Sequence, residues 1–434
     1  MSDFPQFTAL TVALAALFIP TDAAASDAAS APTGPVIEFA RPPPLALAPP
    51  PLALAPGATP APACSFRHAV CVHAAPGTPP SLAIAALSSA EHAWDAFSGA
   101  LALPPPDTDV DGAWHVYLVA DIPEGGRAVL QECDPRARFD RCTSFALVDR
   151  ATPPGCALDV ALARAWARAS LFRAAPATDE ATARAQTEAL ARLAAPCEDP
   201  GPDALAFQSH PEWTLTDRSS AAFDRGAAFF YDWLDATFGR KGAGLLVGLW
   251  ALTPTRTPPG AWRWSATPTG YDVLRASLKG ALSADSTLDD VFVKFAVERA
   301  RAIPPVRTAW HIPWPEHARR LASPEPVFPT GSSYVLVDHA VAPTDAKLRL
   351  EAQWEDYGRM RWVVLKLDAE GRTMAEVPVT SLPRATRASL TVESLENVDR
   401  LLVVGVNLGS TEHPFDPDQG EWEPHGWLVT LEGQ

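Results

Sequence analysis

The hydrophobic pattern of the chain changes its period near residue 330. Before this point apolar residues recur at helical spacing, as in Phe223–Phe238, which is typical of amphipathic helices. After it apolar and polar residues alternate over short runs, as in Lys347–Trp354, which is typical of half-buried strands. At 434 residues the chain is also longer than one ordinary domain. We therefore expect an α+β domain followed by an all-β antiparallel sandwich domain.

Seven of the alternating runs are predicted to be strands of the sandwich. They are Tyr334–Asp338, Lys347–Trp354, Arg361–Leu367, Ala375–Val379, Ala388–Val392, Arg400–Asn407 and Gly426–Leu431. Pro378 lies in the fourth run, and because proline has no backbone N–H to donate, this run is predicted to be an edge strand. The segments with helical spacing are Ser88–Leu101, Leu158–Ala174, Glu180–Ala194, Phe223–Phe238, Gly244–Leu252, Tyr271–Leu282 and Leu288–Ala302. Two further runs are predicted to be strands of the first domain: Trp114–Ala120 and Ser144–Asp149.

Residues 1–25 are predicted to be a signal peptide. Phe7–Pro20 is an apolar run with the length of a signal-peptide core, and small residues that fit a cleavage site follow it. Residues 26–63 are predicted to be a Pro/Ala-rich disordered linker, because the sequence PPLALAP occurs twice and prolines at this density prevent helix and sheet. The folded parts are then 64–303 and 326–434, with a Pro-rich linker at 304–325. We expect a secreted, periplasmic or cell-surface protein.

The cysteines agree with export, because an even number in an exported chain implies disulfides. Six cysteines allow 15 connectivities. Pairing of neighbours along the chain predicts three bonds: Cys64–Cys71, Cys133–Cys142 and Cys156–Cys197. A zinc site built from Cys64, His68, Cys71 and His73 is the alternative, although its spacing fits no common zinc module.

The charge of the chain excludes one class of partner. The chain has 51 acidic and 35 basic side chains and a formal net charge of −16. Proteins that bind nucleic acid need clustered cations to meet phosphate, so we expect no nucleic-acid partner. No apolar run beyond the N-terminus is long enough to cross a bilayer, so no transmembrane span is expected after signal removal. The expected partner is an extracellular protein or peptide.

Two arginines four residues apart lie in the predicted helix Leu158–Ala174. The stretch ALARAWARA contains Arg164, Ala165 and Arg168 at the spacing of H-E-x-x-H, and Glu188 follows 20 residues after Arg168 in the next predicted helix. This order of strands and helices resembles the gluzincin-type, thermolysin-like zinc metallopeptidases, in particular an exported branch, with the H-E-x-x-H motif lost.

The resemblance implies a zincin-like fold for residues 64–303. In that family two histidines on one helical face chelate zinc, the glutamate between them activates water, and a glutamate from the next helix is the third ligand. The resemblance places Arg164 and Arg168 at the histidine positions, Ala165 at the position of the base and Glu188 at that of the third ligand.

These substitutions decide the predicted chemistry. A guanidinium group is always protonated and has no lone pair for a metal, so Arg164 and Arg168 cannot ligate zinc, and Ala165 cannot act as a base. We predict that zinc is absent and that the protein is a catalytically inactive pseudo-peptidase. We also predict that Arg164 or Arg168 pairs with Glu188, since an unpaired buried carboxylate is costly. The alternative is a solvent-exposed face of an Ala-rich helix.

Other residue clusters have a functional and a structural interpretation. Four acids lie close together in one loop: Asp416, Asp418, Glu421 and Glu423. Their oxygens suit a calcium site, and the structural alternative is a solvent-exposed loop. Four tryptophans fall in the predicted sandwich: Trp354, Trp362, Trp422 and Trp427. The functional interpretation is a platform on which sugars stack, and the structural one is that they pack in the sandwich core. Ser209 and His210 suggest a Ser/His/Asp hydrolase, but the chain has no G-x-S-x-G motif.

Three functions remain open from the sequence. The first is a non-catalytic protein that binds an extracellular polypeptide or partner through the former active-site cleft. The second is an active secreted metal-dependent hydrolase or protease with a non-standard site of scattered His, Asp and Glu. The third is a cell-surface adhesion or carbohydrate-binding protein that acts through the sandwich.

Overall fold

The structure is a computed structural model that describes most of the chain beyond residue 60. It covers residues 61–108, 111–134, 141–175, 178–197, 201–215, 220–239, 244–252, 270–283, 286–339, 345–356, 358–381, 385–409 and 423–434. The predicted signal peptide 1–25 lies outside the described residues, and so does the predicted linker 26–63 apart from its last three residues.

The first domain contains a mixed sheet of five strands in the order β1-β2-β3-β5-β4. The strands are β1 (Ala63–Cys64), β2 (Val70–Ala74), β3 (Trp114–Val119), β4 (Gly126–Asp134) and β5 (Arg141–Asp149). β2, β3 and β5 are parallel, whereas β1 and β4 run antiparallel to their neighbours. Within the described residues β4 therefore has a strand on one side only, and its other backbone edge is unpaired.

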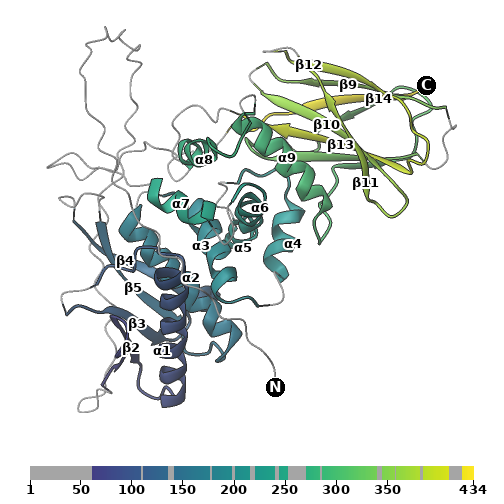
Figure 1. Cartoon of the computed structure of the whole chain (residues 1–434). Coiled ribbons are helices and arrows are strands. Elements are labelled where there is room, and N and C mark those ends of the chain that lie inside the picture. Colours follow the sequence, from purple (N-terminus) through teal and green to yellow (C-terminus); the bar gives the residue numbers. More distant parts are fainter. Residues whose placement is uncertain are drawn as a thin grey trace, which may run out of the picture. The chain divides into compact units, whose positions relative to one another are not determined.

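Helix α2 (Cys156–Ala174) is the central element of this domain. It packs against β4 and β5 of the sheet and against α1 (Pro80–Trp94), which continues as the π-helix η1 (Asp95–Ala100) (Figure 1). The Trp166 ring of α2 is fully buried and lies 5.9 Å from Trp94 and 5.0 Å from Phe97, between ring centroids. Since α2 is buried on most of its surface, the alternative of a solvent-exposed Ala-rich helix is wrong.

Close approach of β4 to α2 depends on small residues. Gly126 begins β4, and a Cβ atom there would lie 3.1 Å from Cβ of Ala161 in α2. This distance is shorter than an ordinary van der Waals contact, so a larger residue would push the start of the strand away from the helix. The short 3₁₀ segment η2 (Pro123–Gly125) leads into this contact.

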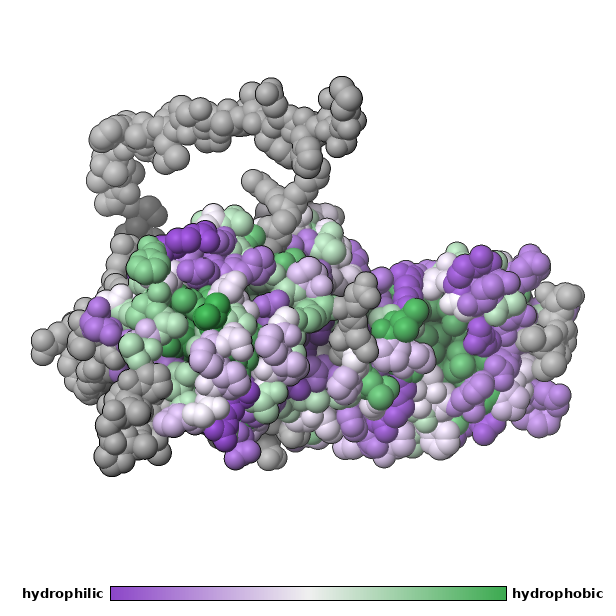
Figure 2. Space-filling view, turned by 90° about the horizontal axis from the view of Figure 1, so that it is seen from below, coloured by the Kyte–Doolittle hydropathy of each residue, from purple (hydrophilic) through white to green (hydrophobic). Residues whose placement is uncertain are grey.

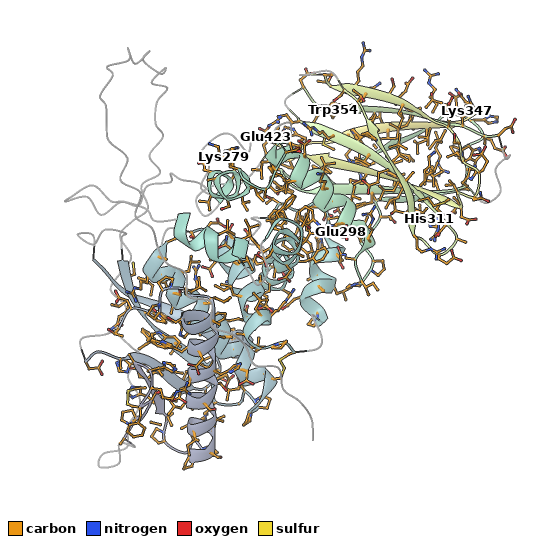
Figure 3. The ribbon with its side chains drawn as sticks, viewed as in Figure 1. Lys279, Glu298, His311, Lys347, Trp354 and Glu423 are labelled. Carbon is orange, nitrogen blue, oxygen red and sulfur yellow. A yellow bond between two sulfur atoms is a disulfide. The ribbon has the colours of Figure 1, made fainter. Side chains whose placement is uncertain are left out.

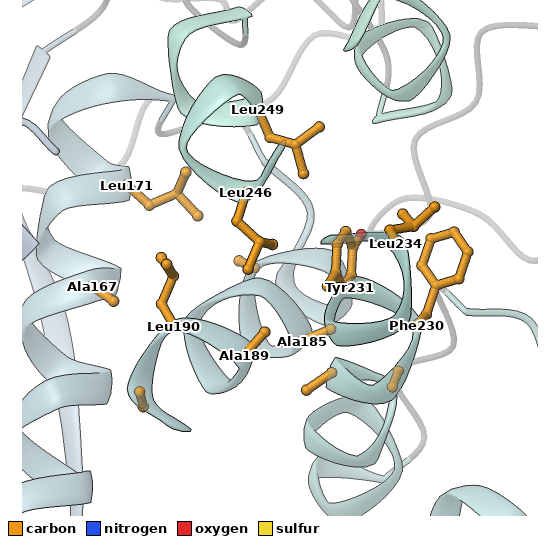
Figure 4. Close-up of a cluster of buried hydrophobic side chains, with 14 of the residues drawn as sticks. Ala167, Leu171, Ala185, Ala189, Leu190, Phe230, Tyr231, Leu234, Leu246 and Leu249 are labelled. Atoms are coloured by element: carbon orange, nitrogen blue, oxygen red, sulfur yellow. The ribbon is translucent and has the colours of Figure 1, made fainter. Parts of the chain in front are cut away.

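Further helices follow, and their buried side chains share one core with the sheet. They are α3 (Glu180–Ala194), α4 (Gly201–Ser209), α5 (Ala221–Gly226), α6 (Ala228–Phe238), α7 (Gly244–Leu252), α8 (Gly270–Leu278) and α9 (Leu288–Arg301). Apolar side chains of four helices converge on one buried cluster, shown in Figure 4. Among them are Ala167, Leu171, Ala185, Ala189, Leu190, Phe230, Tyr231, Leu234, Leu246 and Leu249.

One predicted helix is interrupted in the structure. The sequence predicts a continuous helix over Phe223–Phe238, but the chain forms α5 and α6, which meet at Ala227. Gly226 ends α5 against α4, where an added Cβ would lie 2.2 Å from the carbonyl oxygen of Asp203. The glycine allows this backbone contact between the helices, and its requirement is tertiary, so helical periodicity alone did not reveal it.

Two of the predicted disulfides are present. Cys64 is bonded to Cys71, and Cys156 is bonded to Cys197. The second bond joins the start of α2 to the segment just after α3. Cys142 is also disulfide-bonded, and it lies opposite Cys133 in the register of β4 and β5, but the side chain of Cys133 lies outside the described residues.

The C-terminal region forms two sheets. Their orders are β11-β10-β13-β8-β6 and β12-β9-β14-β7. The strands are β6 (Trp310–Ile312), β7 (Arg319–Ala322), β8 (Ser332–Asp338), β9 (Leu348–Trp354), β10 (Met360–Leu367), β11 (Thr373–Val379), β12 (Arg387–Val392), β13 (Arg400–Asn407) and β14 (Trp427–Gly433). Inward side chains of both sheets share one core, so they pack as a sandwich. Pro378 lies in β11, which is an edge strand as predicted.

Two expectations for this region need correction. The segment 304–325 was expected to be a linker, but it contributes β6 and β7 to the two sheets, and Ile312 and Leu321 are buried in the shared core. The sandwich is also not wholly antiparallel, because β6 pairs with β8 in parallel.

The described surface mixes polar and apolar residues. Figure 2 shows hydrophilic and hydrophobic residues interspersed over the face that it presents. Among the described residues, no helix has the length and apolar character that crossing a membrane requires.

Candidate functional site

Arg164 and Glu188 form an ion pair between the packed helices α2 and α3. Nε of Arg164 donates a hydrogen bond to Oε2 of Glu188, whose side chain is only 6% exposed. Nε of Arg192, one turn further along α3, lies 3.5 Å from Oε1 of the same carboxylate. Two cations thus neutralise a buried acid that would be costly alone. The predicted pairing of Glu188 is confirmed, with Arg164 as its partner.

Arg168 pairs with a different acid. Its Nη2 donates a hydrogen bond to Oε2 of Glu180 at 2.6 Å, and its guanidinium carbon lies 4.6 Å from the centroid of the Phe172 ring. The other oxygen of Glu180 accepts a hydrogen bond of 3.1 Å from Nε of Arg184. Glu180, in the first turn of α3, is therefore a carboxylate held between two guanidinium groups.

Two further arginines are anchored by acids behind them. Nη1 of Arg184 donates to Oδ2 of Asp224, which is fully buried, at 3.0 Å. Nε and Nη2 of Arg225 make two bonds of 2.8 Å to the carboxylate of Asp203, and its Nη1 lies 2.6 Å from Oε2 of Glu124. Burial alone would lower the pKa of Arg225, but the hydrogen bonds and negative charges of Asp203 and Glu124 outweigh it and raise that pKa.

These arginines line one pocket of ≈ 580 Å³ beside β4, with α2, α3 and α5 forming its other walls. The guanidinium groups in the lining belong to Arg127, Arg164, Arg168, Arg184 and Arg225. Two carboxylates also line it, those of Glu124 and Glu180, so the lining carries a net charge of +3. Pockets of this size can enclose a small ligand or part of a larger one.

Arg127 differs from the other four arginines. It lies on β4, its side chain is exposed, and within the described residues it forms no hydrogen bond or ion pair. Arg164 uses only Nε in its pair with Glu188, and its Nη1 and Nη2 make no hydrogen bond in the described part of the chain. The pocket therefore has unused N–H donors on two of its walls.

The residues at the positions that the resemblance assigns to the zinc motif do not fit a zinc ion. Zinc in proteins takes imidazole, thiolate or carboxylate ligands. Here two guanidinium groups and the methyl group of Ala165 stand at three of the four positions, and the fourth, Glu188, is already paired with Arg164. No group of three His, Cys, Asp or Glu residues among the described ones is arranged to hold a metal ion.

The alternative zinc site near the N-terminus is excluded, because Cys64 and Cys71 are bonded to each other. His68 pairs with Asp95 at 2.9 Å. His73 belongs to a histidine cluster on the sheet that the sequence did not predict: its Nε2 lies 2.9 Å from Nδ1 of His115.

This cluster continues from His115, whose Nε2 lies 3.1 Å from Oδ1 of Asp111. Burial and the neighbouring His115 lower the pKa of His73. Because the spacing along the chain is irregular, only the pairing of β2 with β3 brings these residues together.

The other residue clusters that the sequence suggested do not form functional sites among the described residues. Trp354, Trp362 and Trp427 are buried in the sandwich core, so they do not form an exposed platform; Trp354 is labelled in Figure 3. Of the acidic loop only Glu423 is described, and it is exposed, whereas Trp422 and the acids Asp416, Asp418 and Glu421 lie outside the described residues. The hydroxyl of Ser209 donates to the carbonyl of Leu205 rather than to His210.

Comparisons with known proteins identify no family. No protein-family model and no curated protein matches the chain. Among solved structures, the pre-peptidase C-terminal domain of a collagenase from Bacillus anthracis is 5% identical and covers 29% of this chain and 97% of its own, with a TM-score of 0.20. The periplasmic inhibitor of g-type lysozyme from Aeromonas hydrophila is 10% identical over 29% of this chain and 100% of its own, with a TM-score of 0.17. Similarity at this level carries no argument about function.

Proposed function

We propose that the chain is an exported, catalytically inactive relative of the gluzincin-type metallopeptidases that binds an extracellular polypeptide in the pocket beside β4. The observation that carries the proposal is the ion pair between Arg164 and Glu188. A fixed guanidinium stands where the resemblance places a zinc ligand, and it neutralises the acid that the resemblance makes the third ligand. The site keeps its arginines, and Ala165, at the position that the resemblance assigns to the base, cannot activate water.

The sheet supports a polypeptide as the ligand. Five consecutive residues of β4, 126–130, line the pocket. Side chains of a strand alternate between its two faces, so a pocket lined by consecutive residues runs along the strand's edge. That edge has no neighbouring strand in the described part of the chain, and an extended peptide can pair with the free N–H and C=O groups of such an edge.

The disulfides support an extracellular place of action. Cys64–Cys71 and Cys156–Cys197 need an oxidising environment to form and persist. The bond from Cys156 also fixes α2, which carries Arg164, to the end of α3, which carries Glu188. The disulfide therefore supports the wall of the pocket on which the proposal depends.

Binding and cleavage are tested together on the purified full chain. A panel of unfolded polypeptides is screened by biolayer interferometry, and the same panel is incubated with the protein and added zinc in a general protease assay. We expect saturable binding, no cleavage and no stoichiometric zinc by elemental analysis. Cleavage that a chelator abolishes would contradict the proposal and favour the active hydrolase.

Hydrogen–deuterium exchange then locates the bound polypeptide. We expect slower amide exchange in β4 when ligand is bound, because its free edge becomes hydrogen-bonded. Protection confined to residues 326–434 would instead favour adhesion through the sandwich and would refute the assignment of the pocket.

A further inference from the structure

The charge of the pocket opposes the charge of the chain. The whole sequence has a formal net charge of −16, yet the lining of this one pocket carries five guanidinium groups against two carboxylates. All five cations are arginines, whose planar N–H groups match the two oxygens of a carboxylate better than an ammonium group does. Four of these guanidinium groups are paired with acids, so the uncompensated charge within the described residues is that of Arg127. Its N–H groups, with the unbonded ones of Arg164, favour an anionic ligand.

The pocket already binds carboxylates of its own chain. Glu180 lies between Arg168 and Arg184, with donor–acceptor distances of 2.6 and 3.1 Å. Glu124 lies 2.6 Å from Arg225. The geometry of these arginines therefore suits carboxylate oxygens, and both internal acids leave other N–H donors of the pocket unused.

The unused donors come from two different elements that line the pocket. Arg127 comes from β4 and has no partner among the described residues, whereas Arg164 comes from α2 and keeps Nη1 and Nη2 unbonded. Arg225 is already ion-paired with Asp203 and Glu124. A ligand carboxylate bound beside β4 can therefore accept hydrogen bonds from both arginines.

We propose that the pocket selects acidic peptides, with a glutamate or aspartate side chain of the bound segment paired to Arg127 and Arg164. This inference rests on the proposed function, because it assigns the ligand class of the same pocket. The peptide backbone pairs with the edge of β4, which supplies affinity without sequence preference. The two arginines add the preference for acidic side chains.

The test uses labelled peptides of equal length in which valine alternates with glutamate, glutamine or lysine. Binding to the full chain is measured by fluorescence anisotropy at about 0.15 M salt, where interactions over long distances are screened. We expect the glutamate peptide to bind about tenfold or more tightly than the glutamine peptide, and the lysine peptide to bind most weakly. Equal affinity for the glutamate and glutamine peptides would overturn the inference.

A charge reversal locates the preference. Arg127→Glu should weaken binding of the glutamate peptide by about tenfold or more and should reduce its advantage over the glutamine peptide, because it places a like charge beside the ligand. Arg127 is exposed and unpaired within the described residues, so the substitution breaks no hydrogen bond or ion pair among them.

Arg150→Glu is the matched control. Arg150 is also exposed, lies in the turn after β5, and its side chain forms no bond in the described part of the chain, but it does not line the pocket. The control should leave affinity unchanged. An equal loss in both variants would mean that the overall field, not the pocket, selects the ligand, and would overturn the inference.

Failure of this inference can be separated from failure of the proposed function. If the polypeptide panel binds at β4 but the glutamate peptide has no advantage, only the acidic preference is wrong. If a phosphorylated peptide binds while the glutamate peptide does not, the ligand class is wrong although the pocket is anion-selective. If no polypeptide protects β4 from exchange, the proposed function itself fails.

Discussion

The ion pair between Arg164 and Glu188 gives a stability prediction whose size follows from burial. Glu188→Ala leaves two guanidinium groups without their shared acceptor: that of Arg164, which is 22% exposed, and that of Arg192, which is 28% exposed. Removing one half of a fully buried pair costs ~3–5 kcal/mol. Both arginines reach solvent in part, and Arg192 keeps a bond of 3.0 Å to Asp232. We therefore expect a loss of about 2–3 kcal/mol in the free energy of unfolding.

A double-mutant cycle separates the pair from the packing around it. Two unit charges about 4 Å apart attract by ~4 kcal/mol at an effective dielectric constant of ~20, and partial exposure of Arg164 reduces this. We expect the losses in Arg164→Met and Glu188→Ala to be non-additive, with a coupling energy of about 1.5–3 kcal/mol. Once Glu188 is absent, the charge of Arg164 no longer contributes stability.

Urea unfolding followed by tryptophan fluorescence and far-UV circular dichroism measures these losses. Glu370→Ala is the control, because it removes another arginine partner, that of Arg372, where both side chains are mostly exposed. Exposed pairs contribute little, so this variant should unfold like the wild type. Unchanged stability in Glu188→Ala, or strictly additive losses in the cycle, would refute the reasoning.

Three further predictions concern the same region. Cys156→Ser/Cys197→Ser opens a bond between residues 41 apart and should lower the free energy of unfolding by about 2–4 kcal/mol in urea titrations. Burial raises the pKa of Asp232 to about 6 despite the pairing with Arg192, so the folded state binds an extra proton between about pH 4 and pH 6. The free energy of unfolding of the wild type, measured by urea titration, should therefore fall relative to that of Asp232→Asn as pH rises through this range. Parallel pH profiles of the two proteins would contradict the raised pKa. Arg164→His/Arg168→His should bind zinc by elemental analysis and lose it when Glu188→Gln is added; no uptake would count against the correspondence with the metallopeptidase motif.

Strands and helices were predicted best where buried residues recur at a regular spacing along the sequence. All seven predicted strands from Tyr334 onward correspond to β8–β14, because each has one face in the sandwich core. The other face of β8, β10 and β13 is buried in the core that contains the helices, so these strands are apolar on both faces. The α2 and α3 helices were also predicted nearly in full. The alanines of α2 permit close packing on several sides while they retain high helix propensity.

Elements that depend on tertiary contacts were missed. β6 and β7 lie in a proline-rich segment and are only three and four residues long, so neither shows an alternating pattern of useful length. The break between α5 and α6 depends on the contact of Gly226 with α4, which lies about twenty residues earlier in the chain. The helix propensity of residues 223–238 does not reveal that another helix packs against Gly226.

The same distinction applies to the pocket. Arg164 and Glu188 could be predicted to pair because a motif spacing placed them on facing helices. Arg184 carried a weaker signal, since it lies one turn from both Glu180 and Glu188 on α3. Arg127 and Arg225 carried none, because they reach the pocket from β4 and α5, whose positions follow from the folded sheet and the packed helices.

On our proposal, the pocket's chemistry follows from the residues at the positions that the resemblance assigns to the zinc motif. A zinc ion would polarise a peptide carbonyl and activate water, and both actions need an open coordination position. A guanidinium group offers only N–H donors and a fixed charge, so it can hold an anion but cannot activate a nucleophile. With Glu188 neutralised by Arg164 and Arg192, the other donors of Arg164 and those of Arg127 have no partner in the part of the chain that the structure describes and can bind a ligand. On our proposal, the groove beside β4 has therefore exchanged hydrolysis of a peptide bond for recognition of the acidic side chains that flank it.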